Sequence, residues 1–278
     1  MAGWYEETFR DSMRFSVRVH ATLHRERTDF QTIEVLQTPF FGRTLVLDGL
    51  FMTSERDEYF YHEMISHPSL CMASSPKRVL VIGGGDGGTV REVLRHPEVE
   101  QVTMVEIDRR VVEVCKEHLP DIGTAWNDPR LEVRFEDGVA FVAEAPPASF
   151  DVVLLDGSDP VGPAEGLFDK TFYSNVRRVL SPSGVFGLQS ESPILMEEVF
   201  RQVQHTLAEV FGSVRPYFGT VPLYGASTWS WTVAAAEPFP MDMDRLKRLE
   251  PDLRYLNVDV ARGMFAVPTD LRRLLSRD

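Results

Sequence analysis

The chain is poor in cysteine and has no long hydrophobic run. Its two cysteines, Cys71 and Cys115, cannot form a disulfide framework, and both lie in apolar stretches, so we expect free, buried thiols. No segment approaches the roughly eighteen consecutive apolar residues of a membrane span. The first residues, MAGWYEETFR, lack the apolar core of a secretory signal. We therefore expect a cytoplasmic protein that has no membrane partner.

Positive charge is also scarce. The 278 residues include 29 Lys and Arg against 42 Asp and Glu, which gives a formal net charge of −13. This excess of negative charge argues against nucleic acid or an anionic membrane as the main partner. It leaves cationic small molecules as candidate ligands, although the same charge can serve solubility alone. Hydrophobic residues make up 43% of the chain, enough for a large packed core, and exclude disorder as the main state.

Two hydrophobic patterns divide the chain. Between about residues 14 and 55 apolar and polar residues alternate, which is typical of half-exposed antiparallel strands. Asp48-Gly49, between two apolar runs, predicts a tight hairpin. A helix over about 57–70 follows. We expect a small N-terminal antiparallel β-sheet domain over residues 1–68 and an α/β domain over 69–278.

The second part alternates short apolar runs with helical segments, which predicts a doubly wound parallel sheet. One helix is expected over 170–180 between the last two parallel strands. The expected parallel strands cover residues 78–82, 102–107, 131–135, 150–155 and 185–189. Two further strand-like runs, at 213–218 and 228–234, have no long helix between them and predict a hairpin at the sheet edge.

A run of glycines follows the first expected parallel strand and opens a helix. It fits the G-x-G-x-x-G spacing at Gly83, Gly85 and Gly88. Glycines there permit a tight turn and let a ligand approach the backbone closely. On its own the pattern is weak, because a loop can be tight without binding anything.

Acidic residues at the next two strand ends strengthen the case for a nucleoside ligand. Glu106 ends the second strand, where a carboxylate can accept two hydrogen bonds from a ribose diol. Asp137-Gly138 ends the third strand and can bind an adenine amino group. These positions predict an adenosine-containing ligand across the carboxyl ends of the strands.

Asp86 lies inside the glycine loop and restricts the nature of that ligand. A carboxylate there repels a pyrophosphate and, less strongly, the carboxylate of intact S-adenosylmethionine. It attracts a cationic tail, so the residues favour an adenosine that carries a sulfonium and an ammonium. The alternative is that Asp86 only caps the following helix.

Asp156 and Asp159 end the fourth strand, three residues apart. They can bind a diammonium substrate, and one of them can remove a proton from it. Such a step is needed because an aliphatic amine has a pKa near 10 and is not nucleophilic while protonated. The alternative is a turn stabilised by aspartate side chains. A zinc site is not expected, because His62 and His67 are five residues apart and point about 140° apart on a helix.

Together these motifs resemble spermidine synthases and related polyamine aminopropyltransferases from end to end. The matching segments are Gly3-Trp4, Phe30-Gln31, Leu47–Gly49, Glu55–Glu58, Tyr61–Met64, Gly83–Gly88, Asp156–Glu165, Gln189 and Tyr224. The resemblance implies a methyltransferase-like Rossmann domain behind the N-terminal β-sheet domain. It implies transfer of an aminopropyl group from decarboxylated S-adenosylmethionine, a co-substrate, to putrescine, which gives spermidine and methylthioadenosine. It also implies no metal or prosthetic group, and a homodimer or homotetramer.

The resemblance also implies roles for single residues. Asp86 and Asp156 match residues that hold the aminopropyl ammonium of the donor, and Asp156 also matches the proton acceptor. Tyr61 matches a residue that orients the attacking nitrogen in the acceptor pocket. The other matches are Gln31, Glu106, Asp137 and Gly138 for the nucleoside, Asp159 and Tyr224 for the acceptor pocket, and Trp4, His62 and Gln189 near the two substrates.

Some residues depart from the family pattern. Met52 stands where relatives commonly carry Gln, the loop over 221–229 around Tyr224 differs from theirs, and Ala261 replaces a frequent His. These departures leave the acceptor open, so cadaverine, agmatine or spermidine remain alternatives to putrescine.

Three other functions stay open beside aminopropyl transfer. They are an S-adenosylmethionine-dependent methyltransferase, a non-catalytic polyamine-binding protein and a nicotinamide oxidoreductase. Asp86 disfavours the first because it repels the methionine carboxylate. Asp156, Asp159 and Tyr61 disfavour the second, because a binding protein has less need of a proton acceptor.

Overall fold

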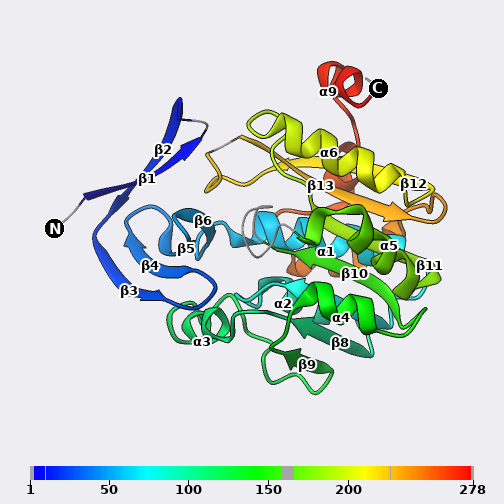
Figure 1. The fold of residues 1–278 in the computed structure, drawn as a ribbon, viewed down its shortest axis with the longest axis horizontal. Coiled ribbons are helices and arrows are strands. Elements are labelled where there is room, and N and C mark those ends of the chain that lie inside the picture. The colour runs from blue at the N-terminus through cyan, green and yellow to red at the C-terminus, as the bar shows by residue number, and fades with distance from the viewer. Residues whose placement is uncertain (1–2, 10, 158–165, 226, 277–278) are drawn as a thin grey trace.

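Two small antiparallel sheets open the computed structural model, which describes residues 3–9, 11–157, 166–225 and 227–276. The first is a hairpin of β1 (Gly3–Phe9) and β2 (Met13–Val19). The second contains, in sequence order, β3 (Ala21–Arg27), β4 (Thr32–Thr38), β5 (Gly42–Leu47) and β6 (Leu50–Ser54). Figure 1 shows the hairpin projecting from one end of the molecule, beside the N-terminus.

The predicted hairpin at Asp48-Gly49 is confirmed. These two residues join β5 to β6, whose Leu47 and Leu50 face each other. Both turn residues have positive φ, 46° for Asp48 and 93° for Gly49, as the tight turn that suits twisted strands requires.

The prediction that the N-terminal strands are half-exposed is wrong for β4, which is buried on both faces. Ile33 and Val35 pack in one cluster with helix α3 (Arg109–His118). Leu36, on the other face, packs in a cluster that includes Val17 of β2. The four-stranded sheet is thus covered on one face by a helix of the second part and on the other by the first hairpin.

Helix α1 (Glu58–Met72) connects the small sheets to the large one and contains Pro68. A proline within a helix cannot donate to the carbonyl four residues before it. Here that carbonyl belongs to Met64, and the Tyr217 hydroxyl donates to it at 2.7 Å. The boundary expected after residue 68 falls within this helix and stays a prediction.

The large sheet has seven strands in the order β12-β13-β11-β10-β7-β8-β9. Strands β7 to β11 pair in parallel, β13 pairs antiparallel with β11, and β12 pairs antiparallel with β13. The Rossmann-like sheet and its edge hairpin are thereby confirmed. The strands are β7 (Arg78–Gly83), β8 (Gln101–Val105), β9 (Leu131–Arg134), β10 (Phe150–Asp156), β11 (Leu180–Gln189), β12 (Ser213–Thr220) and β13 (Thr228–Ala235).

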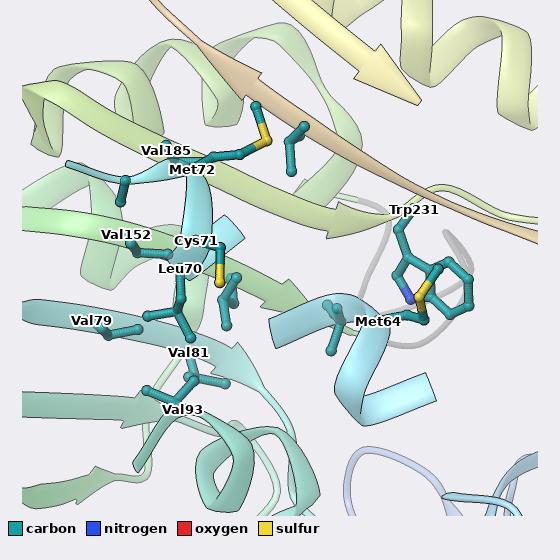
Figure 2. Packing of buried hydrophobic residues seen from close by; sticks show 14 of the residues in the cluster. Met64, Leu70, Cys71, Met72, Val79, Val81, Val93, Val152, Val185 and Trp231 are labelled. Atoms are coloured by element: carbon teal, nitrogen blue, oxygen red, sulfur yellow. The ribbon is translucent and has the colours of Figure 1, made fainter. Parts of the chain in front are cut away.

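Helices cover both faces of this sheet (Figure 1). Val79 and Val81 of β7 face α1, whose Leu70 and Cys71 lie over them in Figure 2. Leu80 of β7 faces the opposite layer, which α4 (Gly138–Glu144), α5 (Lys170–Val179) and α6 (Glu197–Ala208) form. The remaining helices are α2 (Gly88–Leu94), α7 (Met243–Leu249), η2 (Glu250–Asp252), α8 (Val258–Gly263) and α9 (Thr269–Leu275).

Cys71 and Cys115 are free and buried, as predicted. In the described part of the chain, no helix has the length and hydrophobicity to cross a membrane.

The strand order changes direction between β7 and β10. From β7 the chain proceeds outward to β8 and β9, and it then returns to β10 on the other side of β7. Ligands of such sheets bind in the crevice beyond the carboxyl ends of the strands at this point. Asp86, Glu106, Asp137 and Asp156 lie in that crevice.

Candidate active site

Two adjoining cavities open at the carboxyl ends of β7 and β10. The first lies between the glycine loop and the four-stranded sheet, and the second lies between β6, β11 and the first hairpin. Among the described residues they share Met52, Tyr61, Gly157 and Tyr224. The first cavity contains these predicted site residues: Gln31, Tyr61, His62, Gly83, Gly85, Asp86, Glu106, Asp137, Gly138, Asp156 and Tyr224.

The glycine loop is held directly against the end of β10. The Gly84 amide donates to the Asp156 carbonyl oxygen at 2.9 Å. Gly83 has a φ of +80°, and a Cβ there would lie 2.2 Å from the same oxygen. Only glycine fits this approach, so the turn that carries Asp86 and the strand end that carries Asp156 form one rigid unit.

Two acidic residues line the first cavity at the next strand ends. Burial raises the pKa of Glu106 to about 7, although its carboxylate accepts a hydrogen bond from the Asp108 amide at 2.9 Å. Asp137 begins α4 and accepts a hydrogen bond from the Val139 amide at 2.8 Å. Their positions on neighbouring strands suit a ribose diol and an adenine ring in one ligand.

The loop between β3 and β4 forms the opposite wall of the first cavity. The Gln31 amide group donates to an Asp108 carboxylate oxygen at 3.1 Å, and the Thr28 hydroxyl donates to the same oxygen at 2.8 Å. Asp108 is also the N-cap of α3. The small sheet is therefore fastened to the start of a Rossmann helix beside the cavity.

Asp86 has two different partners. One carboxylate oxygen accepts from the Gly88 amide at 2.8 Å, and the other lies 3.3 Å from Nε2 of His62. Asp86 thus accepts a hydrogen bond at the start of α2, as expected if it caps this helix, and it also lines the first cavity. Burial opposes ionisation of Asp86, but the charge and hydrogen bond of His62 hold its pKa below the ordinary value.

The surroundings of Asp156 shift its pKa in the opposite direction from that of Asp86. Burial and the neighbouring negative charge of Asp86 raise its pKa, while His62 and the hydroxyl of Tyr61 oppose the rise. Burial and Asp156 raise the pKa of Tyr61 well above its ordinary value, so its phenol keeps its proton. A carboxylate with a raised pKa beside a permanent hydroxyl donor is suited to accept a proton from a bound ligand.

Aromatic side chains separate the two cavities. The ring of Tyr224 lies 6.1 Å from that of Tyr61 and 4.7 Å from that of Trp229 between centroids. Its hydroxyl donates to the Met52 carbonyl at 2.6 Å, which fixes β6 against the loop after β12. The predicted residue Tyr224 is thereby placed at the junction.

Gln189 lines the second cavity, as do Glu191 and Glu7. Its side chain accepts from the Glu191 amide at 2.9 Å and donates to the Glu191 carboxylate at 3.2 Å. Glu191 has a φ of +67°, which is strained for a residue with a side chain. The amide and hydroxyl of Ser230 donate to its carbonyl at 3.1 and 2.6 Å and hold it there.

One predicted residue, Trp4, is not brought into these cavities. Trp4 lies on β1 with 67% of its surface exposed and lines neither cavity. Trp4 lies near the start of β1, whereas Thr8 and Phe9 at the end of the same strand line the second cavity. Asp159 lies outside the described residues. Within the described part of the chain, no group of three or more His, Cys, Asp or Glu side chains could hold a metal.

Sequence reasoning missed several buried carboxylates. Glu7 accepts from the Phe51 amide at 3.0 Å, and Glu58 lies 2.7 Å from His62. The signal for Glu7 was weak, because its strand alternates polar and apolar residues like any surface strand. Glu191 follows the end of a parallel strand by two residues, which is the same signal that identified Asp137.

Known proteins match this chain over nearly its full length. Residues 58–244 match the spermine/spermidine synthase domain, and residues 3–55 match the spermidine synthase tetramerisation domain. A polyamine aminopropyltransferase of Prochlorococcus marinus (strain MIT 9313) is 48% identical over 84% of this chain and 82% of its own. One of Moorella thermoacetica is 41% identical over 98% of this chain and 96% of its own.

Solved structures agree with these relatives. A crystal structure of spermidine synthase in complex with the transition-state analogue AdoDATO has a TM-score of 0.95 at 32% identity, over 98% of this chain and 94% of its own. The structure of spermidine synthase from Thermotoga maritima has a TM-score of 0.93 at 32% identity, with the same coverage. Fold, cavity placement and sequence thus lead to one conclusion: the chain belongs to the spermine/spermidine synthase family.

Proposed function

We propose that the protein transfers the aminopropyl group of decarboxylated S-adenosylmethionine to putrescine, which yields spermidine and methylthioadenosine. One observation carries this proposal: the two cavities meet at Tyr61, and both Asp86 and Asp156 line the first of them. A donor in one cavity and an amine in the other would react at their junction. The relatives named polyamine aminopropyltransferase support the same reaction.

The first cavity fits the donor. Glu106 and Asp137 hold the ribose and the adenine, Gln31 closes the opposite wall, and the glycine loop with Gly83 and Gly85 lets the nucleoside approach the backbone. Asp86 and Asp156 then face the cationic aminopropyl arm. No metal or prosthetic group is required, because the sulfonium already provides a good leaving group.

The chemical step is an in-line displacement. The acceptor nitrogen, once neutral, attacks the methylene next to the sulfonium, a C–N bond forms, the C–S bond breaks, and the thioether leaves uncharged. Asp156 accepts the proton of the amine, and Tyr61 orients the nitrogen. The protein contributes orientation, exclusion of water and removal of a proton.

The second cavity fits the acceptor. Its walls are largely apolar, with Phe9, Leu195 and Trp229 available to contact a methylene chain. Glu7 and Glu191 give it two carboxylates for the distal ammonium. We propose putrescine as the acceptor, with cadaverine, agmatine and spermidine as alternatives, since Met52 and the loop around Tyr224 depart from the family pattern.

Assembly and location are further parts of this proposal. The match to the tetramerisation domain over residues 3–55 supports a homo-oligomer. We propose a homodimer or a homotetramer, which light scattering of the purified protein distinguishes by mass. A substrate-contacting role for Trp4, a role for Asp159 in the acceptor pocket and a cytoplasmic location stay predictions.

Donor discrimination tests the proposed function. Purified protein is titrated calorimetrically with decarboxylated and with intact S-adenosylmethionine, and methylthioadenosine release is followed with putrescine present. We expect tighter binding of the decarboxylated form, because Asp86 repels the extra carboxylate. Equal binding of both forms with methyl transfer would favour a methyltransferase. Binding of the donor and of amines without methylthioadenosine release in the presence of any amine would favour a polyamine-binding protein.

A further inference from the structure

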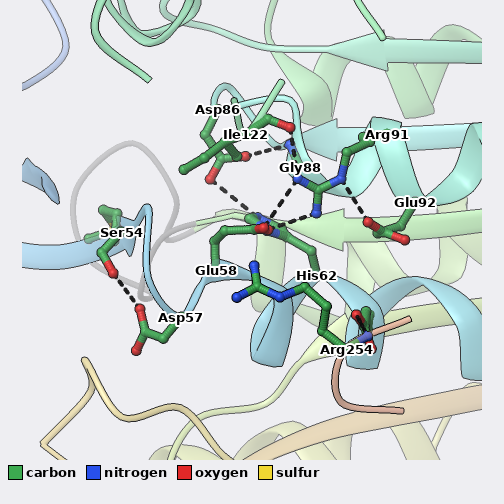
Figure 3. A network of polar contacts seen from close by, with 12 residues as sticks. Ser54, Asp57, Glu58, His62, Asp86, Gly88, Arg91, Glu92, Ile122 and Arg254 are labelled. Atoms are coloured by element: carbon green, nitrogen blue, oxygen red, sulfur yellow. Dashed lines mark hydrogen bonds and ion pairs between the residues drawn. The ribbon is translucent and has the colours of Figure 1, made fainter. Parts of the chain in front are cut away.

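Both ring nitrogens of His62 face carboxylates. Nδ1 lies 2.7 Å from Glu58 and Nε2 lies 3.3 Å from Asp86 (Figure 3). A neutral imidazole has only one N–H and cannot donate on both sides, whereas an imidazolium can. The side chain is 2% exposed, so water does not replace either partner. This geometry describes a buried imidazolium between two carboxylates.

The contacts continue behind Glu58 into the protein. Arg91 donates to both Glu58 carboxylate oxygens at 2.7 and 3.2 Å, and to the Ile122 carbonyl at 2.9 Å. It also donates to Glu92 at 2.7 Å, and Glu92 contacts His67 at 3.1 Å. Opposite charges therefore alternate along the contacts that lead from Asp86 to Glu92.

The position of His62 is fixed by packing as well as by charge. A Cβ on Gly88 would lie 2.3 Å from the imidazole ring, so only glycine leaves room for it at the start of α2. The ring therefore has a single place, directly against the loop that carries Asp86. On the other side of that loop, Gly84 bonds the Asp156 carbonyl.

We propose that Glu58 is a positioning residue that keeps His62 an imidazolium against Asp86, and so decides which of two neighbouring carboxylates stays ionised and which takes up a proton. Asp86 is the ionised one and holds the donor ammonium. Asp156 is the one that accepts the proton. The role in donor binding rests on the proposed function, whereas the charge state of His62 does not.

The charges around His62 determine the sign of the effect. Asp86, Glu58 and Asp156 are the facing anions, and Arg91 is the cation that balances Glu58. Burial alone would lower the pKa of His62, but Asp86 and Glu58 raise it well above the ordinary value. Removing the charge of Glu58 lets His62 lose its proton at lower pH. Asp86 and Asp156 then repel each other without a neighbouring imidazolium to offset their charges, and Asp86 takes up a proton more readily.

Glu58→Gln tests this directly. We expect the acid limb of decarboxylated S-adenosylmethionine binding to move up by about one pH unit, so that at a pH within this limb the variant binds about tenfold more weakly than the wild type. Methylthioadenosine carries no ammonium, so its affinity should change less than about twofold. Glu58→Asp retains the charge and should restore part of the donor affinity.

Glu63→Gln is the matched control. Glu63 is a buried carboxylate on the same helix, where it accepts hydrogen bonds from the Arg254, Tyr255 and Leu256 amides at 2.7 to 2.9 Å. Its substitution should lower the melting temperature without moving the pH dependence of donor binding. If Glu58→Gln behaved in the same way, Glu58 would have only a structural role and the proposal would be overturned.

A second measurement does not depend on the donor. Nitrogen NMR of labelled histidines should show His62, assigned from its loss in His62→Gln, as an imidazolium at pH 8 in the wild type. In the Glu58→Gln variant, His62 should lose its proton below pH 8. A neutral His62 in the wild type would overturn the inference even if aminopropyl transfer were demonstrated, and an imidazolium would sustain the charge assignment even if that transfer failed.

Discussion

The amide of Gly84 donates to the main-chain carbonyl of Asp156 at 2.9 Å and so joins the glycine loop to the end of β10. Because this bond lies within the backbone, it sets the spacing between Asp86, two residues further along the loop, and the Asp156 side chain. When two carboxylates are held near each other, different surroundings give them different pKa values. Here His62 stands beside one of them.

Asp156→Asn should remove the proton acceptor and leave the cavity shape unchanged. We expect turnover to fall by about 10²- to 10⁴-fold, because the attacking amine keeps its proton. Methylthioadenosine should still bind within about threefold of the wild type, since the contacts that we propose for it lie at Glu106 and Asp137. Chromatography of released methylthioadenosine and calorimetry measure the two effects. Near-normal turnover would rule out Asp156 as the base.

Nucleoside binding should depend on pH through Glu106. Burial raises the pKa of this carboxyl to about 7, and the carboxylate accepts both hydrogen bonds of a ribose diol better than the protonated carboxyl, one oxygen of which carries a donor. Affinity for methylthioadenosine should therefore be constant well above pH 7 and fall below it, by up to about tenfold per pH unit. Calorimetric titrations between pH 5.5 and pH 8.5 would show this dependence.

The protonation of Glu106 should also make the free energy of unfolding depend on pH, with a sign opposite to that for nucleoside affinity. The folded protein holds this proton more tightly than the unfolded chain, so the contribution of Glu106 to stability is present at low pH and lost as the pH rises towards 7. Glu106→Gln cannot titrate and serves as the control for both effects. A wild-type affinity that stays flat through pH 6 would contradict the raised pKa.

Met52→Gln should strengthen donor binding. Met52 lines both cavities, and an amide there adds one hydrogen bond to a ligand at their junction. A bond of about 0.5–1.5 kcal/mol lowers the donor KM about two- to tenfold. Met196 lines only the second cavity, so Met196→Gln should leave the donor KM unchanged. The idea fails if steady-state kinetics give the two variants the same donor KM.

Tyr217→Phe should destabilise the fold while the kcat stays within about twofold. It leaves the Met64 carbonyl, which Pro68 cannot reach, without its buried donor, at a cost of about 1–3 kcal/mol in the free energy of unfolding. Tyr173→Phe is the matched control, since the buried Tyr173 hydroxyl has no hydrogen-bond partner among the described residues. Urea unfolding compares them, and equal losses would contradict the assigned role of the Tyr217 hydroxyl.

Much of this fold follows from local patterns in the sequence. The turn at Asp48-Gly49 and the five parallel strands were predictable because hydrophobic period and turn chemistry are properties of short segments. The burial of both faces of β4 was not, because it depends on α3, which lies more than seventy residues further along the chain.

Some residues of the candidate site could likewise be predicted from the sequence, and others could not. Asp86, Glu106, Asp137 and Asp156 could be found because each follows a strand, and parallel strands bring their carboxyl ends together. The charge chain through Glu58 was missed. Glu58 and His62 are four residues apart on α1, a spacing that brings them together, but α1 is buried almost all round and so lacks the exposed face on which such pairs are expected. Arg91 and Asp86 come from other elements, and their positions are a property of packing.

The most direct test of the account is a mass-spectrometric acceptor panel. Purified protein is incubated with decarboxylated S-adenosylmethionine and, separately, with putrescine, cadaverine, agmatine or spermidine. We predict that putrescine gives equal amounts of spermidine and methylthioadenosine, and that methylthioadenosine forms faster with putrescine than with the other amines. Faster release with another amine would reassign the acceptor and make Met52 and the loop around Tyr224 candidates for its selection. No methylthioadenosine with any amine would contradict aminopropyl transfer at the junction of the two cavities.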